Sequence, residues 1–293
     1  MRELARLVEL SKAHARHFDA LALGVIDFKS GKCTLLGDTE IFFDLASVTK
    51  VLAGASVYAL HADKFGAQER LLLEHRAGLP AWGLLPNPGW REQLLAYPVR
   101  DAETLYSDFS CMRFNLAVEQ IFGKATPALL QDHWHPELRF WRDLPSAARC
   151  PVTGARGRGV IRGEVHDPNA WVIGEWCGHA GLFGTLEGVC QTLLKLNKTC
   201  QLLPFVRDGQ RGHSHRFIYG WDRVSDPGAT LAGKGCSPAT FGHLGFTGTS
   251  VWIDPERQVG HVILSNATRD GWYMKEEINE FRRAAGELIW KSL

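Results

Sequence analysis

The chain has 293 residues, of which 45% are hydrophobic and 22% are charged. These values are ordinary for a soluble globular protein, and the length allows one large domain or two. The formal net charge of +1 gives no reason to expect a nucleic-acid partner or an anionic membrane surface. The sequence has no uncharged apolar run of about 18 residues, so we expect no membrane-spanning helix.

The N-terminus and the cysteines bear on the compartment. The first ten residues carry charges throughout and lack the apolar stretch and cleavage site of a signal peptide. The seven cysteines are scattered, and none forms a C-x-x-C pair, which argues against a zinc ribbon or a thioredoxin-like site. We therefore expect free thiols in a cytoplasmic protein, or a periplasmic protein if the chain is a trimmed mature form.

The first part of the chain predicts a helix, a hairpin and a second helix. Apolar residues recur at helical spacing over 2–17. Short apolar runs at 21–27 and 32–36 flank a hairpin turn. The second helix, at 47–62, has no charged residue in its interior after Lys50, so we expect deep burial.

The middle of the chain, 64–175, is long, irregular and rich in Pro, Gly and Trp. Helical segments at 69–75, 89–96 and 108–122 interrupt it. We interpret this region as an inserted, mostly helical subdomain.

Regular structure then returns. We expect a helix near 186–201, a strand at 216–222, paired strands at 247–254 and 258–265, and a closing amphipathic helix at 273–291.

Helices at both ends, with strands early and late, predict an α/β (α+β) fold in which an antiparallel sheet is flanked by helices. We assign 1–63 and 176–293 to the sheet domain and 64–175 to the helical subdomain, with the active site between them.

Ser47 and Lys50 lie three residues apart at the start of the predicted buried helix. Residues at this spacing share a helix face, so the hydroxyl and the ammonium would lie side by side. A serine is a poor nucleophile until a neighbouring base or cation activates it. Alone, the S-x-x-K pattern also fits a helix-capping serine followed by a surface lysine.

Further segments accompany this pair. In chain order they are Leu-Glu-His-Arg-Ala-Gly-Leu-Pro (73–80), Leu-Tyr-Ser-Asp-Phe (105–109), Val-His-Asp-Pro-Asn-Ala (165–170), Gly-His-Ala-Gly-Leu-Phe-Gly (178–184) and Phe-Gly-His-Leu-Gly-Phe-Thr-Gly-Thr-Ser (241–250). With S-x-x-K, the order and spacing of these segments resemble the serine β-lactamase/penicillin-binding protein superfamily. The resemblance is to its branch of class C β-lactamases, D-alanyl-D-alanine carboxypeptidases and related esterases, and it spans about residues 20–266.

The resemblance implies roles for four residues. Ser47 would be the nucleophile that forms an acyl-enzyme, and Lys50 would hold the local field and the proton balance around it. Tyr106 would shuttle the proton between Ser47 and the leaving group, a role for which Lys50 and His243 are expected to lower its pKa from about 10. Asp108 would take the third position of the Y-x-N/D motif and also fits a helix N-cap.

The segment His243-Leu244-Gly245 would lie on the strand that borders the cleft, in place of the family's Lys-Thr-Gly or His-Thr-Gly. Leu244 lacks the hydroxyl that would help to bind a substrate carboxylate, which weakens the case for penicillin or a free D-Ala C-terminus. Gly245 would let a ligand approach the strand. The backbone N–H groups of Ser47 and Phe246 would form the oxyanion hole.

Metal and cofactor sites are not expected. The two His-x-His pairs, at 133–135 and 213–215, have no evident third ligand. The glycine-rich segment 154–163 lacks the spacing of a phosphate-binding loop.

The resemblance therefore implies a serine hydrolase that acts through acyl-Ser47 on an ester or amide bond of a small acyl or D-amino-acid-containing substrate. Leu244 and the apparent lack of a signal peptide favour an esterase or amidase on small acyl substrates, or cytosolic processing of muropeptides. The alternatives are a D-Ala-D-Ala carboxypeptidase or peptidoglycan peptidase, a β-lactamase, and a non-catalytic member that binds a ligand or partner in the same cleft. The oligomeric state is left open.

Overall fold

The computed structural model describes residues 1–271 and 274–292. The strands are β1 (Leu21–Asp27), β2 (Lys32–Gly37), β3 (Phe43–Asp44), β4 (Leu138–Phe140), β5 (Val152–Arg156), β6 (Gly159–Arg162), β7 (Leu182–Gly184), β8 (Phe217–Ile218), β9 (Trp221–Arg223), β10 (Phe241–Leu244), β11 (Ser250–Asp254) and β12 (Val259–Ser265).

The α-helices are α1 (Arg2–His14), α2 (Val48–Lys50), α3 (Ser56–Leu60), α4 (Ala67–Leu73), α5 (Trp90–Ala96), α6 (Asp108–Phe122), α7 (Thr126–Leu130), α8 (Pro168–Ile173), α9 (Leu186–Cys200), α10 (Leu202–Gly209) and α11 (Glu276–Lys291). None of the helices in the described ranges combines the length and the apolar character that a bilayer crossing requires.

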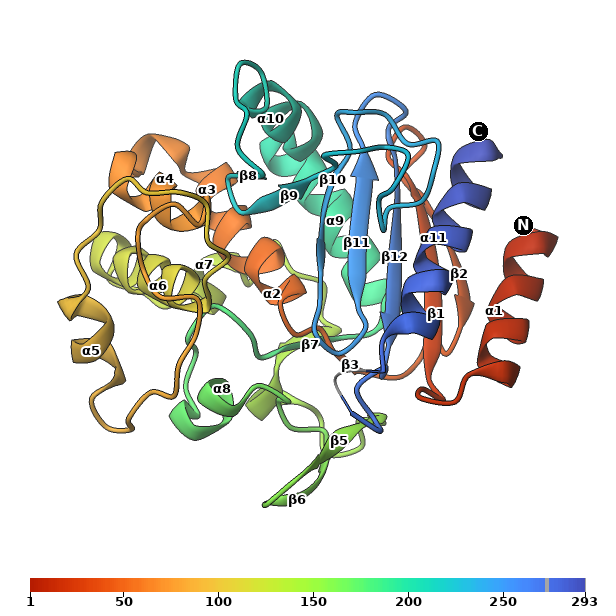
Figure 1. The fold of residues 1–293 in the computed structure, drawn as a ribbon, viewed down its shortest axis with the longest axis horizontal. Helices are drawn as coiled ribbons and strands as arrows, with labels where there is room; N and C mark the ends of the chain where they lie inside the picture. The colour runs from red at the N-terminus through yellow and green to blue at the C-terminus, as the bar shows by residue number, and fades with distance from the viewer. Residues whose placement is uncertain (272–273, 293) are drawn as a thin grey trace.

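The main sheet has seven strands in the order β2-β1-β12-β11-β10-β9-β8, and every neighbouring pair is antiparallel. Helices α1 and α11 lie side by side against one face, and α9 covers the other (Figure 1). Side chains of β1 alternate between two cores, because successive residues of a strand point to opposite faces. Leu21 and Leu23 pack with α1 and α11, whereas Ala22 and Ile26 belong to the core on the α9 side. The predicted antiparallel sheet flanked by helices is confirmed.

Helices α4 to α7 form a layer beside the β8 edge of the sheet (Figure 1). They belong to the region predicted as a helical subdomain, which also holds β4 and the β5–β6 hairpin. Strand β4 pairs with β7, and β7 pairs with β3, just before the serine. The division into domains 1–63 with 176–293 and 64–175 stays a prediction.

Three expected elements differ from the structure. The helix expected at 47–62 is α2 and α3 separated by a π-helical turn, Val51–Ala55. The strand expected at 216–222 is a hairpin, because Tyr219 and Gly220 between β8 and β9 have positive φ angles of 53° and 92°. The last helix begins at Glu276, and residue 273, where we expected it to begin, lies outside the described residues.

Candidate active site

Ser47 stands immediately before α2, and the loop that leads to it is firmly held. Leu45 N donates to Leu182 O (3.0 Å), and Ala46 N donates to Asp44 Oδ1 (2.8 Å). Thr249 from the β10–β11 turn donates its hydroxyl to Leu45 O (2.9 Å). Ala46 has a φ of 46°, a left-handed conformation that costs an alanine about 1 kcal/mol. The contacts of this loop therefore hold a strained residue directly beside the serine.

Lys50 lies beneath Ser47 and is only 3% exposed. Its Nζ donates to Ser47 Oγ (2.8 Å) and to His179 O (2.9 Å) and forms an ion pair with Asp108 (2.8 Å). Burial alone would lower the pKa of Lys50, but Asp108 and then Tyr106 outweigh it, so the pKa is raised. Lys50 is therefore an ammonium with oxygen atoms on three sides, and the predicted contact with Ser47 is present.

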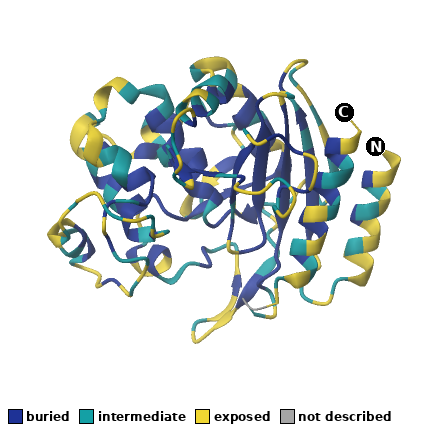
Figure 2. Ribbon diagram, turned by 45° about the horizontal axis from the view of Figure 1, so that its top comes forward, coloured by how far each residue is buried: buried dark blue, intermediate teal, exposed yellow. Residues whose placement is uncertain are grey.

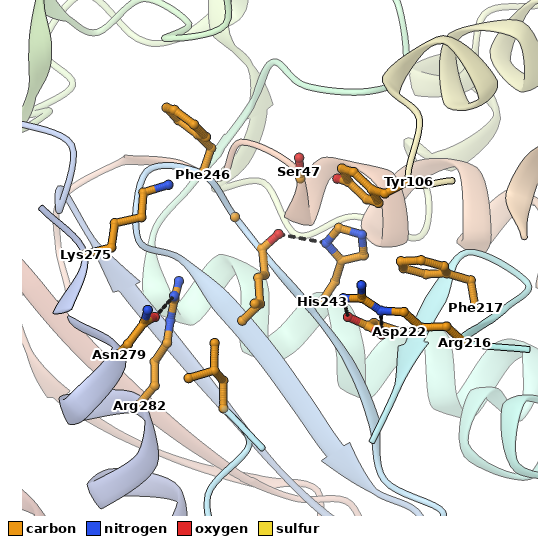
Figure 3. Close-up of a pocket in the computed structure, with 13 residues that line it drawn as sticks. Ser47, Tyr106, Arg216, Phe217, Asp222, His243, Phe246, Lys275, Asn279 and Arg282 are labelled. Carbon is orange, nitrogen blue, oxygen red and sulfur yellow. Dashed lines mark hydrogen bonds and ion pairs between the residues drawn. The ribbon is translucent and has the colours of Figure 1, made fainter. Parts of the chain in front are cut away.

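Tyr106 lies in the loop before α6, beside Ser47 (Figure 3). Its ring centroid is 5.3 Å from Lys50 Nζ and 5.9 Å from the ring of His243. Burial raises the pKa of Tyr106 to about 12, although Lys50 and a hydrogen bond with Ser47 act in the opposite direction. The expected lowering of this pKa by Lys50 is present, but burial outweighs it. The expected contribution of His243 is wrong, because burial and then Lys50 bring the pKa of His243 to about 3 and leave it neutral.

His75, from the segment 73–80, supports this tyrosine and was not identified as a site residue from the sequence. Its ring lies 4.7 Å from that of Tyr106, and its Nδ1 accepts a hydrogen bond from Ser107 N (3.0 Å). Burial and then Lys50 lower the pKa of His75 well below its usual value. The residue is thus a neutral, packed support for the loop. The side chain of Ser107, rather than Asp108, caps α6.

Gly245 is needed for a reason that was not predicted. A Cβ at this position would lie 2.6 Å from Leu45 O and 1.8 Å from Thr249 Oγ1. The strand end therefore packs directly on the loop that carries Ser47. The expected close approach of a ligand at this strand stays a prediction.

An open cleft of about 390 Å³ lies over Ser47 (Figure 3). It is lined by Ser47, Tyr106, Arg216, Phe217, Asp222, Leu231, His243, Leu244, Gly245, Phe246, Lys275, Asn279 and Arg282. All of the site residues predicted from the sequence line this cleft, except Lys50, which contacts Ser47, and Asp108, which contacts Lys50.

Helix α11 and the residue before it contribute a side of the cleft that was not predicted. Lys275 Nζ lies 3.7 Å from the ring centroid of Phe246. Arg282 is 2% exposed and donates to Thr249 O (2.6 Å) and Asn279 Oδ1 (2.7 Å). In the sequence, Arg282 falls on the apolar face of the predicted last helix. Because arginine is rarely buried unless paired, this position is the signal that could have marked Arg282 as a functional residue.

The two cations on this side have no carboxylate partner among the described residues. Burial lowers the pKa of Arg282 to about 10. Burial and then Arg282 lower the pKa of Lys275 to about 8. Arg216, on the opposite side, is held by two hydrogen bonds to Asp222 (2.9 and 2.7 Å). A bound anion would therefore find its partners at Lys275 and Arg282.

One group of possible metal ligands, Asp108, Asp167 and His179, occurs within the ranges that the structure describes. Each member already has an ionic partner: Asp108 contacts Lys50, and Asp167 Oδ1 lies 2.9 Å from His179 Nε2.

The amino-acid sequence matches the Beta-lactamase family model over residues 22–280. Two curated relatives, from Salmonella gallinarum (strain 287/91 / NCTC 13346) and Salmonella agona (strain SL483), carry the name "Putative D-alanyl-D-alanine carboxypeptidase". The first is 26% identical over 70% of this chain, and the second is 25% identical over 79%. The chain spans 59% of the length of the first relative and 71% of the second.

Solved structures share the fold. A class C beta-lactamase in complex with cefoxitin aligns with a TM-score of 0.70 at 13% identity, over 100% of this chain and 98% of that one. A D-alanine carboxypeptidase from Burkholderia cenocepacia gives 0.68 at 14%, over 100% and 98%. EstCE1, a hydrolase with promiscuous acyltransferase activity, gives 0.65 at 16%, over 96% and 98%.

The resemblance inferred from the motifs is thereby confirmed. The family match covers the strands of the main sheet, the serine loop and most of the cleft. Members of this family are serine hydrolases. The chain belongs to the Beta-lactamase family.

Proposed function

We propose that this protein is a serine hydrolase that forms an acyl-enzyme on Ser47 and cleaves a small ester or amide carrying a carboxylate. The observation that carries the chemistry is the 2.8 Å contact between Lys50 Nζ and Ser47 Oγ at the base of an open cleft. The substrate class is supported by Lys275 and Arg282, two cations of the cleft without an acidic partner in the described chain.

The proton of Ser47 needs an acceptor when the hydroxyl attacks. Lys50 is a poor acceptor because it is already an ammonium with three oxygen neighbours. Tyr106, a phenol with a raised pKa of about 12, can accept the proton of Ser47 while it passes its own proton to the leaving group. One proton enters the phenol and one leaves it, so the tyrosine ends the step unchanged. Water then hydrolyses the acyl-enzyme by the reverse route.

The oxyanion would be held by the backbone N–H groups of Ser47 and Phe246. The packing of Gly245 on Leu45 supports this pairing, because it joins the two segments rigidly. Gly245 N also donates to Thr249 O (2.7 Å), which fixes the main chain just before Phe246. Donors of this kind are each worth about 3 kcal/mol of transition-state stabilisation.

Intact-mass measurement after exposure to a fluorophosphonate tests the nucleophile, with Ser47→Ala as the control. We expect a single adduct on the wild type and none on the variant. A parallel exposure to a penicillin asks whether the cleft accepts a D-Ala-D-Ala mimic. A folded wild-type protein without any adduct would contradict the hydrolase and favour a ligand-binding member of the family.

A matched substrate pair tests the substrate class. A p-nitrophenyl ester of a four-carbon acyl chain is compared with the same ester bearing a terminal carboxylate, and both are compared with a D-Ala-D-Ala peptide. We expect a higher kcat/KM for the carboxylate ester than for the neutral one. Turnover of the peptide without turnover of either ester would instead favour the carboxypeptidase, as the names of the two curated relatives suggest.

A further inference from the structure

Two segments of the sequence, 165–170 and 178–184, supply no side chain to the chemistry proposed above. The structure joins them through one histidine. His179 Nε2 lies 2.9 Å from Asp167 Oδ1, and His179 Nδ1 lies 3.4 Å from Cys177 Sγ. Both ring nitrogens therefore have a partner, and the side chain is only 1% exposed.

The main chain of the same histidine contacts the catalytic group. Its carbonyl accepts the hydrogen bond from Lys50 Nζ at 2.9 Å. Within the described ranges, residues 177–180 make no hydrogen bond between backbone groups, so regular secondary structure does not fix this carbonyl. The ring of His179 is thus the anchor of the loop at this point.

Asp167 connects the anchor to a helix. It is the N-cap of α8, and its Oδ1 accepts from Ala170 N at 2.8 Å as well as facing His179. The same carboxylate oxygen therefore caps the N-terminus of α8 and contacts the imidazole of His179. The contacts run without a break from α8 through Asp167 and His179 to Lys50.

The two cations of this cluster, His179 and Lys50, lie among two carboxylates, Asp167 and Asp108. Acceptor and donor atoms of Asp108, Asp167 and His179 lie within 4.8 Å of one another, with Lys50 against Asp108. Burial opposes the charge on His179, but Cys177 and Asp167 outweigh it and raise its pKa well above the usual value. Burial likewise opposes the charge on Asp167, yet its pKa falls to about 2, chiefly because of His179.

We propose that Asp167 and His179 are positioning residues that hold the Lys50 ammonium against Ser47 through the carbonyl of His179. The inference rests on the proposed function, in which Lys50 contacts the nucleophile Ser47. Without the carbonyl, the ammonium would keep Asp108 and lose one of the three oxygens that fix its direction. A shift of about 1 Å in a reacting geometry can cost about a hundredfold in rate.

The cluster has the order of a thiol–imidazole–carboxylate triad, but it is not a second nucleophilic site. Cys177 is completely buried, so no substrate reaches its sulfur. The contacts of His179 serve Lys50.

Three variants at one position separate positioning from capping. Asp167→Asn keeps an oxygen for both Ala170 N and His179. Asp167→Ser keeps a helix cap but is too short to reach the imidazole. Asp167→Ala removes both contacts. The readouts are the thermal midpoint and the rate of fluorophosphonate labelling of Ser47 per folded molecule.

We expect the asparagine variant to label within about threefold of the wild type, and the serine and alanine variants to label about 30-fold more slowly. The serine variant should keep a thermal midpoint close to that of the asparagine variant. Labelling of the serine variant at the wild-type rate would overturn the inference and leave Asp167 as a helix cap alone.

A second readout does not depend on hydrolysis. In protein labelled with ¹⁵N-lysine, the buried Lys50 ammonium is identified by its loss in Lys50→Arg, and its hydrogen exchange is measured. We expect faster exchange in Asp167→Ser than in Asp167→Asn. Equal exchange in the two variants would contradict positioning. Absence of labelling in the wild type would instead contradict the proposed function and leave this comparison intact.

Discussion

The two sides of the cleft differ in whether their charged side chains have an ionic partner. On the serine side, Lys50 and Asp108 are paired, and the neighbouring His75 and His243 are neutral. On the α11 side, Arg282 and Lys275 line the same cleft without a carboxylate partner in the described residues. Almost all residues from 43 to 53 are buried. Figure 2 shows the strands of the main sheet as buried, whereas the helix at the C-terminus, α11, carries exposed residues along its outer edge.

The difference separates chemistry from recognition. A buried, paired network keeps its protonation states over a wide pH range, and loss of one member leaves the other charge uncompensated. An unpaired buried cation is unfavourable until an anion arrives. The serine side is therefore complete before the substrate binds, whereas the α11 side is completed by the substrate.

The largest expected effect is at Lys50. Lys50→Met should lower the rate of Ser47 labelling about a thousandfold. It should also destabilise the fold by about 2 kcal/mol, because it leaves the carboxylate of Asp108 without its cation. Urea denaturation and probe kinetics measure the two effects. The double variant Lys50→Met/Asp108→Asn should recover stability without recovering labelling, and no recovery of stability would show that the pair is not the cause.

Arg282 should behave differently. Arg282→Met should raise KM for the carboxylate ester about tenfold, since a charged hydrogen bond to a carboxylate is worth about 1.4 kcal/mol or more. It should leave kcat/KM of the neutral ester nearly unchanged and cost at most about 1 kcal/mol of stability. Steady-state kinetics on the matched esters provide the test. Equal losses on both esters would mean that the arginine acts on the catalytic groups, which would break the comparison.

Lys275 should make the binding of the carboxylate ester depend on pH. Its pKa of about 8 means that the cation is present below that pH and is lost above it. KM for the carboxylate ester should therefore rise about fivefold between about pH 7 and about pH 9, whereas KM for the neutral ester should stay flat. Lys275→Arg should remove the dependence, because arginine stays charged. The same rise with the neutral ester would point to another group.

The smallest expected effect is at Leu244, which lines the cleft with an apolar side chain. Leu244→Thr supplies the hydroxyl that the family usually has at this position. We expect kcat/KM for the D-Ala-D-Ala peptide or the carboxylate ester to rise about threefold, the worth of one modest hydrogen bond. Leu244→Val is the matched control for the change in volume. A gain in both variants would attribute the effect to space instead of hydrogen bonding.

The local part of the site could be predicted from the sequence. The contact of Ser47 with Lys50 depends on helical spacing over three residues, and the pairing of β11 with β12 follows from hydrophobic periodicity. Strand β10, which carries His243, was expected only from the family resemblance. The raised pKa of Tyr106 could not be predicted in this way, because it arises from burial by segments far apart in the chain.

The other failures have equally specific causes. The β8–β9 hairpin depends on two positive φ angles at Tyr219 and Gly220, within what reads as one continuous strand. The π-helical turn at Val51–Ala55 has no signature in apolar spacing. The role of Arg282 depends on which strand end lies opposite α11, which is decided by the whole sheet order.

Ala46 has a consequence for attempts to make this protein more heat-resistant. Its φ of 46° means that glycine would relieve steric strain there, although glycine also gives more freedom to the unfolded chain. A selection for thermal resistance alone could therefore accept a change at the residue next to the nucleophile. The variant Ala46→Gly would gain tolerance to heat. Because glycine restricts the backbone less than alanine does, the orientation of Ser47 would at the same time become less fixed. Directed evolution of this fold should thus screen turnover and melting together, since this short loop is where the two demands conflict.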